Sequence, residues 1–229
     1  MKTGNLKAVL FDMDGVLYDS MKNHASAWTK VMLRHGFQIT EQEAYMHEGR
    51  TGDSTIDLIS KREGKIIGAE ERKRIYAEKT VEFAACPPVV PMAYSVKLLR
   101  KVTGNGLMVM LVTGSGQPSL LEQINTDFPE FFTRETMITA FDYVRGKPNP
   151  DPYLMALERG KILHNEAIVI ENAPLGIQSA KAAGIYTVAA NTGPLPDAVL
   201  RNAGADLIFP SIKAVYDHWE KILERKSGS

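Results

Sequence analysis

The stretch VLFDMDGVL, residues 9–17, joins a short apolar run to two carboxylates, Asp12 and Asp14, and then to a glycine. An apolar run of this length predicts a buried β-strand, and open α/β sheets bind their ligands beyond the carboxyl ends of such strands. Two carboxylates this close repel each other unless a cation joins them or one takes a proton. The stretch therefore predicts either a site for metal-assisted chemistry, with a nucleophile and an acid/base, or an acidic turn that only ends a strand.

Apolar, β-branched runs recur along the chain, and after residue 90 helix-like segments separate them. The predicted strands cover residues 7–11, 107–113, 137–141, 167–171, 186–191 and 207–210. The predicted helices between them cover residues 93–102, 117–125, 151–159, 174–183 and 196–202. Strands alternating with helices of this length indicate right-handed crossovers and a parallel sheet covered on both faces. We therefore expect a doubly wound, Rossmann-like α/β fold.

The segment that follows the first strand breaks this alternation and reads as helical throughout. Apolar residues recur at helical spacing after Met21, Thr40 begins a capping box, and residues 69–84 read as a long helix. Prolines at 87, 88 and 91 favour a stiff return to the sheet. We expect an α/β core formed by residues 1–18 and 89–229 and an inserted helical domain formed by residues 19–88, called the cap below.

The overall composition is that of an ordinary water-soluble globular protein. The 229 residues are 44% hydrophobic and 24% charged, and 27 basic residues balance 27 acidic ones. This balance does not favour nucleic acid or an anionic membrane surface as a partner, and no run is long enough to span a membrane. The single cysteine, Cys86, and the lack of a long apolar stretch near residue 1 predict a cytoplasmic protein. The oligomeric state is left open.

Two other strand ends carry groups suited to an anion. Thr113 ends the strand at 107–113, and Gly114 and Ser115 follow it, so that a hydroxyl and flexible backbone amides are available to cradle a phosphoryl group. Lys147 lies in a proline-rich stretch that fixes the origin of its ammonium group, which can neutralise a transferring phosphoryl group. The alternatives are an ordinary glycine turn and a solvated loop charge.

A fourth strand end carries Glu171 and Asn172, directly before a helix that begins near Pro174. Two oxygen-bearing side chains there can bind a hard cation directly or through water, although an asparagine before a helix can also serve as its N-cap. Each group has an ordinary structural explanation. Four such groups at the same edge of one sheet nevertheless favour a shared catalytic site.

These residues resemble a known family in order and spacing. The motifs DMDGV at 12–16, VTGSG at 112–116, GKPNPD at 146–151 and VIENAPLG at 169–176 are similar to the four motifs of the haloacid dehalogenase superfamily. The resemblance covers nearly the whole chain and is closest to the β-phosphoglucomutase-like phosphatases and mutases, which carry a helical cap. It implies an enzyme that transfers phosphoryl groups.

The resemblance also implies a role for each motif residue. Asp12 would attack phosphorus to form an aspartyl-phosphate, and Asp14 would protonate the leaving oxygen and then deprotonate the acceptor. Thr113 and Lys147 would hold the phosphoryl oxygens, since a carboxylate attacks a phosphate dianion only after its charge is offset. Mg²⁺ would be bound by oxygens at the strand ends, namely those of Asp12, the Asp14 main chain, Glu171 and Asn172.

Asn172 departs from the family pattern, which usually has an acid at this position. A neutral amide oxygen binds Mg²⁺ less strongly than a carboxylate does, so Glu171 carries more of the coordination or the affinity is lowered. We still expect Mg²⁺ to be required. A non-catalytic protein that binds a phosphorylated metabolite is the alternative that Asn172 leaves open.

Two cap residues are candidates for substrate binding. His24 shares a helical face with Trp28, and in mutase-like relatives a cap histidine near this position faces the active site. Arg50 lies in a glycine-flanked loop that can aim it at a second anionic group. The mutase pattern places its arginine about two residues later, where this chain has Gly52. We therefore prefer a phosphatase acting on a small phosphorylated metabolite, such as a sugar phosphate, over a β-phosphoglucomutase-type phosphomutase.

Overall fold

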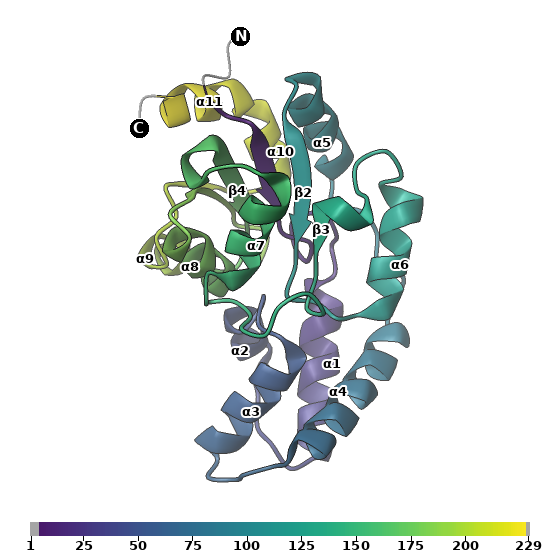
Figure 1. Cartoon of the computed structure of the whole chain (residues 1–229). Helices are drawn as coiled ribbons and strands as arrows, with labels where there is room; N and C mark the ends of the chain where they lie inside the picture. Colours follow the sequence, from purple (N-terminus) through teal and green to yellow (C-terminus); the bar gives the residue numbers. More distant parts are fainter. Residues whose placement is uncertain (1–4, 228–229) are drawn as a thin grey trace.

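The computed structural model describes residues 5–227 and contains one six-stranded parallel sheet in the order β3-β2-β1-β4-β5-β6 (Figure 1). Every pair of neighbouring strands is parallel. The strands are β1 Ala8–Phe11, β2 Met108–Val112, β3 Met137–Ile138, β4 Ala167–Glu171, β5 Tyr186–Ala190 and β6 Leu207–Phe209. The predicted doubly wound α/β fold is confirmed.

The strand order reverses at β1, which pairs with β2 on one side and with β4 on the other. Such a switch point leaves a crevice beyond the carboxyl ends of the strands, where doubly wound sheets bind their ligands. The residues that directly follow β1, β2 and β4 therefore meet at this edge. They include Asp12, Thr113 and Asn172.

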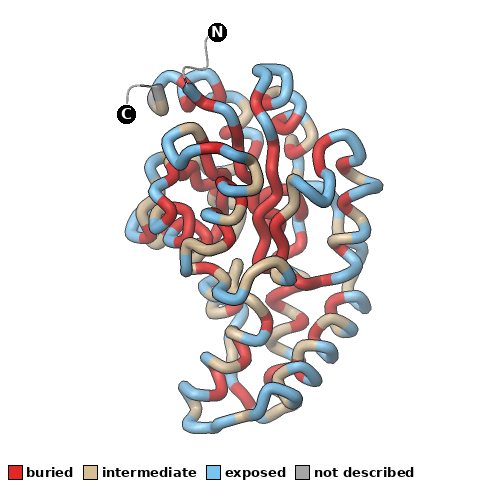
Figure 2. Tube along the Cα trace, in the orientation of Figure 1, coloured by how far each residue is buried: buried red, intermediate tan, exposed pale blue. Residues whose placement is uncertain are grey.

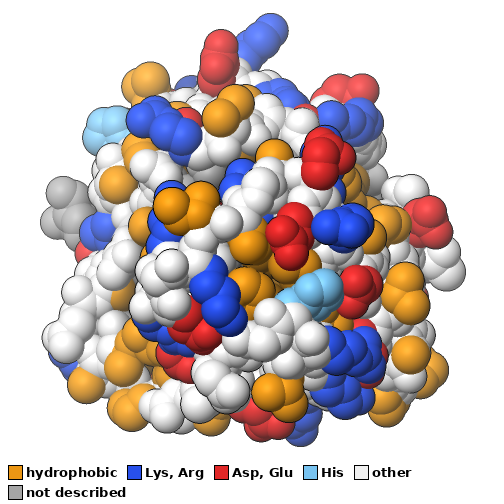
Figure 3. Space-filling model, turned by 90° about the horizontal axis from the view of Figure 1, so that it is seen from below, with side chains coloured by type: hydrophobic (Ala, Val, Ile, Leu, Met, Phe, Trp, Pro, Cys, Tyr) orange, Lys and Arg blue, Asp and Glu red, His pale blue; other side chains and the backbone are white. Residues whose placement is uncertain are grey.

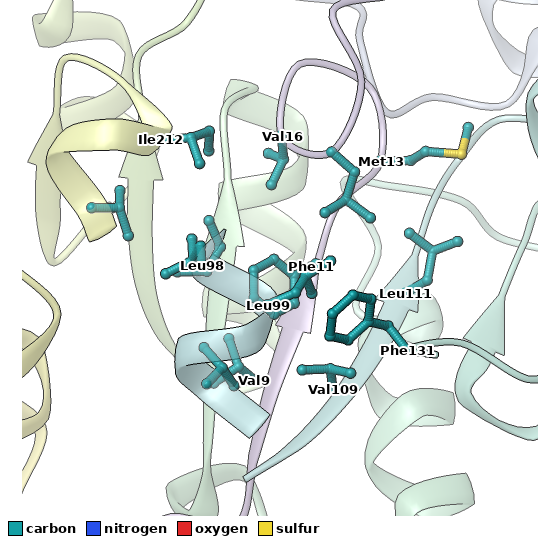
Figure 4. Packing of buried hydrophobic residues seen from close by; sticks show 14 of the residues in the cluster. Val9, Phe11, Met13, Val16, Leu98, Leu99, Val109, Leu111, Phe131 and Ile212 are labelled. Atoms are coloured by element: carbon teal, nitrogen blue, oxygen red, sulfur yellow. The ribbon is translucent and has the colours of Figure 1, made fainter. Parts of the chain in front are cut away.

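Helices cover both faces of the sheet because alternate strand residues point to opposite sides. Val9 and Phe11 of β1 pack with Leu98 and Leu99 on one face, as Figure 4 shows, whereas Leu10 packs in a separate cluster on the other. The first face is covered by α5 Ser95–Gly104, α6 Pro118–Asp127, α10 Ile212–Asp217 and α11 Trp219–Ser227. The second is covered by α7 Asp151–Gly160, α8 Pro174–Ala182 and α9 Asp197–Asn202. Strands β1 and β4 are accordingly buried along their whole length, and β2 and β5 are buried except at their first residue (Figure 2).

The remaining helices lie beyond the carboxyl edge of the sheet, at the lower end of Figure 1. They are α1 Met21–Arg34, α2 Glu41–Met46, α3 Gly52–Arg62 and α4 Ala69–Ala84. Helices α1, α3 and α4 pack around an apolar cluster of their own that includes Val31, Ile56 and Ile75, and α2 packs against α1. The capping box predicted at Thr40 is present, with Glu43 as its partner. Two 3₁₀ turns, Arg134–Thr136 and His164–Glu166, complete the helical elements within residues 5–227.

The two chain segments that join these helices to the sheet run side by side. The Met92 N–H donates to the Leu17 carbonyl at 2.7 Å, and the Asp19 N–H donates to the Val90 carbonyl at 3.0 Å. Both crossings between the helical part and the sheet are thus held together at one place.

The surface carries mixed charge. On the face seen from below in Figure 3, basic and acidic side chains lie interspersed with apolar ones. Over residues 5–227, no helix is both long enough and apolar enough to cross a lipid bilayer.

Candidate active site

Asp12 is the first residue after β1 and shares a buried ammonium group with Glu171. The Nζ of Lys147 donates to Asp12 Oδ1 and to Glu171 Oε1, both at 2.6 Å, and to the Val112 carbonyl at 3.0 Å. Burial raises the pKa of Asp12 to about 8, and the charge of Glu171 adds to this because one ammonium group cannot neutralise two carboxylates. The same two carboxylates outweigh burial at Lys147 and hold its pKa well above the usual range.

Glu171 is held by a full set of donors. Besides Lys147, the Tyr153 hydroxyl donates to Oε1 at 2.9 Å, and the backbone N–H groups of Asn172 and Ala173 donate to Oε2. Tyr153 is fully buried. Since both carboxylate oxygens already accept hydrogen bonds, a cation next to this residue would contact it most easily through a bridging water.

Asp14 is oriented by residues at the start of the cap. Its Oδ1 accepts from the Ser20 hydroxyl at 2.6 Å and lies 3.0 Å from His24 Nε2. Burial acts to raise the pKa of Asp14, but the charge and hydrogen bond of His24, with Ser20, outweigh it and lower that pKa. Both donors converge on Oδ1, so Oδ2 is the oxygen left to exchange a proton.

A buried lysine lies behind His24. Lys79 of α4 places its Nζ 2.7 Å from His24 Nδ1, which makes a chain from the ammonium group through the imidazole to Asp14. Burial lowers the pKa of Lys79 to about 7, and burial together with the Lys79 charge lowers that of His24. A neutral imidazole that accepts at Nδ1 carries its proton on Nε2 and donates it toward Asp14.

Gly15 lets the chain turn sharply after the two carboxylates. It adopts a φ of +82°, and a Cβ there would lie 2.0 Å from the Nδ2 of Asn172. Any other residue would be strained and would collide with the neighbouring strand end. The glycine therefore keeps Asp14 and Asn172 close to each other.

The predicted phosphate cradle faces a small cavity. Thr113, Gly114 and Ser115 line a cavity of about 50 Å³ together with Asp12 and Asp14. Thr113 Oγ1 accepts from the Ser115 N–H at 2.9 Å, which fixes the loop. The remaining wall comes from the cap and includes His24, Glu48, Arg50, Tyr76 and Lys79. The cap thus lies closed over the strand ends.

Glu48 brings a carboxylate from the cap to the predicted metal ligand Asn172. Its Oε1 accepts from Asn172 Nδ2 at 2.9 Å, and the side chain is buried. Burial and the charge of Asp12 raise the pKa of Glu48 well above its usual range. The acid that the family pattern has at position 172 is missing here, and a carboxylate from the cap lies beside that position.

The groups at this edge fit a divalent cation. The Oδ1 of Asn172 is buried and has no hydrogen-bond partner within residues 5–227. Carboxylates outnumber ammonium groups here, because Asp12 and Glu171 share the Lys147 ammonium group and Glu48 lies against Asn172. In the described chain, no three His, Cys, Asp or Glu side chains form a metal-binding group on their own. A cation here would therefore use the Asn172 amide oxygen and main-chain oxygen besides carboxylates.

Arg50 and Gly52 lie on the cap side of the cavity. Arg50 donates to Ser54 Oγ at 3.2 Å, whereas its buried Nε has no partner in the described part of the chain, so this side chain keeps donor capacity for an anion. A Cβ at Gly52 would lie 2.1 Å from ring atoms of Tyr76. The Tyr76 ring therefore occupies the space that a longer side chain at position 52 would need.

Fold and site together fit an enzyme that transfers phosphoryl groups. Residues 9–190 match the haloacid dehalogenase-like hydrolase family, and the chain belongs to that family. It is an enzyme of the phosphatase or phosphomutase type, as the motifs predicted.

Three similar proteins carry phosphatase or phosphomutase names. The chain is 28% identical to hexitol phosphatase A of Escherichia coli over 91% of this chain and 93% of that protein. It is 30% identical to validoxylamine A 7'-phosphate phosphatase of Streptomyces hygroscopicus over 91% of this chain and 95% of that protein. A solved structure described as "Putative beta-phosphoglucomutase from Bacteroides vulgatus" is 54% identical, with a TM-score of 0.92 over 98% of this chain and 91% of that one.

The residues predicted from sequence come together at one edge of the sheet. Those that line the cavity are Asp12, Asp14, His24, Arg50, Thr113, Gly114 and Ser115, and those in contact with Asp12 or at the adjoining strand end are Lys147, Glu171 and Asn172. Sequence reasoning missed Glu48, Tyr76 and Tyr153. The sequence did offer one signal for Glu48. Asn172 lacks the acid of the family pattern, and Glu48 is an acid directly before the Gly49-Arg50 loop.

Proposed function

We propose that this protein is a Mg²⁺-dependent phosphatase that hydrolyses a small phosphorylated metabolite through an aspartyl-phosphate on Asp12. The proposal rests on the two carboxylates that follow β1, because they have different hydrogen-bond partners. Asp12 lies against the Lys147 ammonium group, whereas Asp14 is held through a single oxygen by Ser20 and His24. Carboxylates with such different surroundings suit a nucleophile and an acid/base.

Asp12 forms the bond to phosphorus. Its carboxylate attacks in line, and the bond between phosphorus and the leaving oxygen breaks as the new bond forms. Lys147 offsets the negative charge that the carboxylate and the phosphoryl group bring together, and Thr113 and the following amides hold the phosphoryl oxygens. Asp12, the Asp14 carbonyl and Asn172 would hold Mg²⁺, with Glu48 and Glu171 nearby, and the cation would supply further neutralisation of that charge.

Asp14 moves the protons. Because its pKa is lowered, Asp14 first takes up a proton at Oδ2 from solvent, gives that proton to the leaving oxygen, and as a carboxylate then takes a proton from the water that attacks the aspartyl-phosphate. The attack of this water on phosphorus breaks the bond to Asp12, restores the Asp12 carboxylate and releases inorganic phosphate. The cap, residues 19–88, closes over the core of residues 1–18 and 89–229 and excludes bulk water during the first step.

The substrate class is a phosphorylated carbohydrate or a smaller phosphate. The relatives named for hexitol phosphate and validoxylamine 7'-phosphate support a sugar or sugar-like ester. The closed cavity of about 50 Å³ is smaller than a sugar, so the cap must open for such a substrate to enter and bind. Arg50 is placed to contact the far end of the bound molecule.

A phosphomutase of the β-phosphoglucomutase type is the second candidate, because the Bacteroides vulgatus structure carries that name. A mutase must bind a second phosphate on the cap side of its bisphosphate intermediate. Tyr76 fills the space beside Gly52, and Arg50 is the nearby cation with an unpaired donor. The filled space beside Gly52 favours water over a sugar hydroxyl as the acceptor, whereas the unpaired donor of Arg50 is what a second phosphate would use.

The test is phosphate release from a panel of phosphates at fixed Mg²⁺. The panel contains a hexitol phosphate, glucose 6-phosphate, β-glucose 1-phosphate, glycerol 3-phosphate and pyrophosphate, with conversion of β-glucose 1-phosphate to glucose 6-phosphate followed in parallel. A phosphatase releases phosphate, and a mutase forms glucose 6-phosphate without net release. Turnover that survives Asp12→Asn or exhaustive chelation would contradict the mechanism, and absence of turnover across the panel would favour a non-catalytic binding protein.

A further inference from the structure

Gln117 is a core residue whose side chain reaches into the cap. It directly precedes α6 and is 1% exposed. Its Oε1 accepts from Lys79 Nζ at 3.4 Å, and its Nε2 donates to the Thr80 carbonyl at 3.3 Å. One amide thus binds two successive residues of α4 across the boundary between core and cap.

The buried ammonium group of Lys79 has few hydrogen-bond acceptors besides Gln117. The hydrogen-bond acceptors of its Nζ in the described chain are His24 Nδ1 and Gln117 Oε1, and the surroundings are the aromatic rings of Trp28 and Phe83, whose centroids lie 5.5 and 5.0 Å away. A buried ammonium group with so few acceptors takes its direction from each of them. Removing the Gln117 acceptor therefore takes away one of the two hydrogen bonds that fix the direction of this group and loosens its alignment with His24.

The backbone also ties Gln117 to the phosphate cradle. Its N–H donates to Ser115 Oγ at 3.2 Å, and Ser115 in turn donates its N–H to Thr113 Oγ1. The preceding Gly116 N–H donates to the Tyr76 hydroxyl at 3.3 Å. The loop that cradles the phosphoryl group is thus the same loop that contacts α4.

We propose that Gln117 is a positioning residue through which cap closure aligns the acid/base. When the cap lies against the core, Gln117 orients Lys79, Lys79 donates to His24 Nδ1, and His24 holds its remaining proton on Nε2 toward Asp14 Oδ1. The proton that Asp14 gives to the leaving oxygen is then carried on Oδ2, facing the cavity. With the cap open, Gln117 and Lys79 separate and this alignment is lost. The inference rests on the proposed phosphatase function.

The test compares two substrates whose leaving groups differ in whether they need a proton. Acetate leaves without a proton, whereas an alkoxide needs one, so misalignment of Asp14 slows alkyl phosphates more than acetyl phosphate. For Gln117→Leu we expect kcat/KM for the best alkyl phosphate of the panel to fall about tenfold more than kcat/KM for acetyl phosphate. Gln123→Leu is the matched control, because this amide on the same helix donates to the Val89 carbonyl and should leave the ratio unchanged.

A double-mutant cycle shows whether Gln117 acts through Lys79. Gln117→Leu should change the ratio of the two kcat/KM values in the parent and leave it unchanged in a Lys79→Met background. A change of equal size in both backgrounds, or equal losses for both substrates, would overturn the inference.

A spectroscopic measurement separates this inference from the proposed function. The ¹⁵N shifts of His24 should report the Nε2–H tautomer in the parent and a mixture in Gln117→Leu, whether or not a phosphate is turned over. An unchanged tautomer in a folded Gln117→Leu variant counts against the inference. Loss of all phosphate turnover in the parent counts against the proposed function alone.

Discussion

Replacing Asp12 by asparagine should stabilise the protein while it abolishes turnover. Burial and the Glu171 charge raise the pKa of Asp12 from 3.8 to about 8. Between these two pKa values the unfolded chain releases the proton and the folded protein keeps it, which costs the folded parent roughly 4 kcal/mol of stability at pH 7 and about 2 kcal/mol at pH 5. Asparagine keeps the shape and the acceptor for Lys147 but carries no charge, so the variant avoids this cost.

The sign of the pH dependence follows from the raised pKa. The folded parent binds the Asp12 proton more tightly than the unfolded chain does, so this group contributes its full stability below about pH 4 and loses it as pH rises toward 8. The variant has no such loss. The difference in unfolding free energy, variant minus parent, should therefore grow by about 3 kcal/mol between pH 5 and pH 7.

Urea unfolding in the presence of a chelator measures this difference at each pH. Asp197→Asn, at the exposed start of α9, is the control for loss of a carboxylate outside the site. A difference for Asp12→Asn that stays constant from pH 5 to pH 7, or an asparagine variant less stable than the parent at both, would refute the reasoning. Turnover of the best panel substrate is measured on the same samples and should be lost.

Further predictions concern the cation, the cap and the buried tyrosine. Glu48→Gln should weaken Mn²⁺ binding, measured by electron paramagnetic resonance, by about tenfold. Adding Asn172→Asp to this variant should restore the affinity, because the core then supplies the carboxylate. Equal Mn²⁺ affinity in all variants would contradict this prediction. Gly114→Ala should reduce kcat/KM without lowering the melting temperature, since its Cβ would lie 2.0 Å from the Gly49 carbonyl of the closed cap. Tyr153→Phe should destabilise the protein by about 1 kcal/mol in urea unfolding through loss of one buried hydrogen bond, and a neutral effect would argue against that bond.

The core half of the site was predictable because of the sheet itself. In a parallel sheet every strand ends at the same edge, so polar residues that follow apolar runs are brought together whatever the lengths of the connecting helices. Asp12, Thr113 and Asn172 each follow a strand that was visible in the sequence. The predicted strand at 137–141 was longer than the observed β3, Met137–Ile138, because the hydrogen bonds of Thr139 to Asp142 turn the chain early.

The cap half depended on packing that leaves no local pattern. Arg50 was predicted to face the substrate and lines the cavity, yet Glu48, two residues earlier, is the residue that contacts the core at Asn172. Which side chain of a short loop crosses to another domain is decided by how the domains close. The helix α10, Ile212–Asp217, was missed for a different reason, since its few buried apolar residues span too short a segment to show a clear period.

The position of Glu48 links cation binding to cap closure. Closing the cap brings this carboxylate near Asp12 and against Asn172, and the charge of Asp12 already acts on it at this distance. Without a cation the repulsion between the two carboxylates opposes closure, whereas a divalent cation between them converts the same closeness into an attraction. The closed form should therefore bind Mg²⁺ more tightly than the open form, and by linkage Mg²⁺ should favour the closed form to the same extent. With asparagine at position 172, the cation site that we propose would gain the carboxylate of Glu48 only when the cap lies against the strand ends.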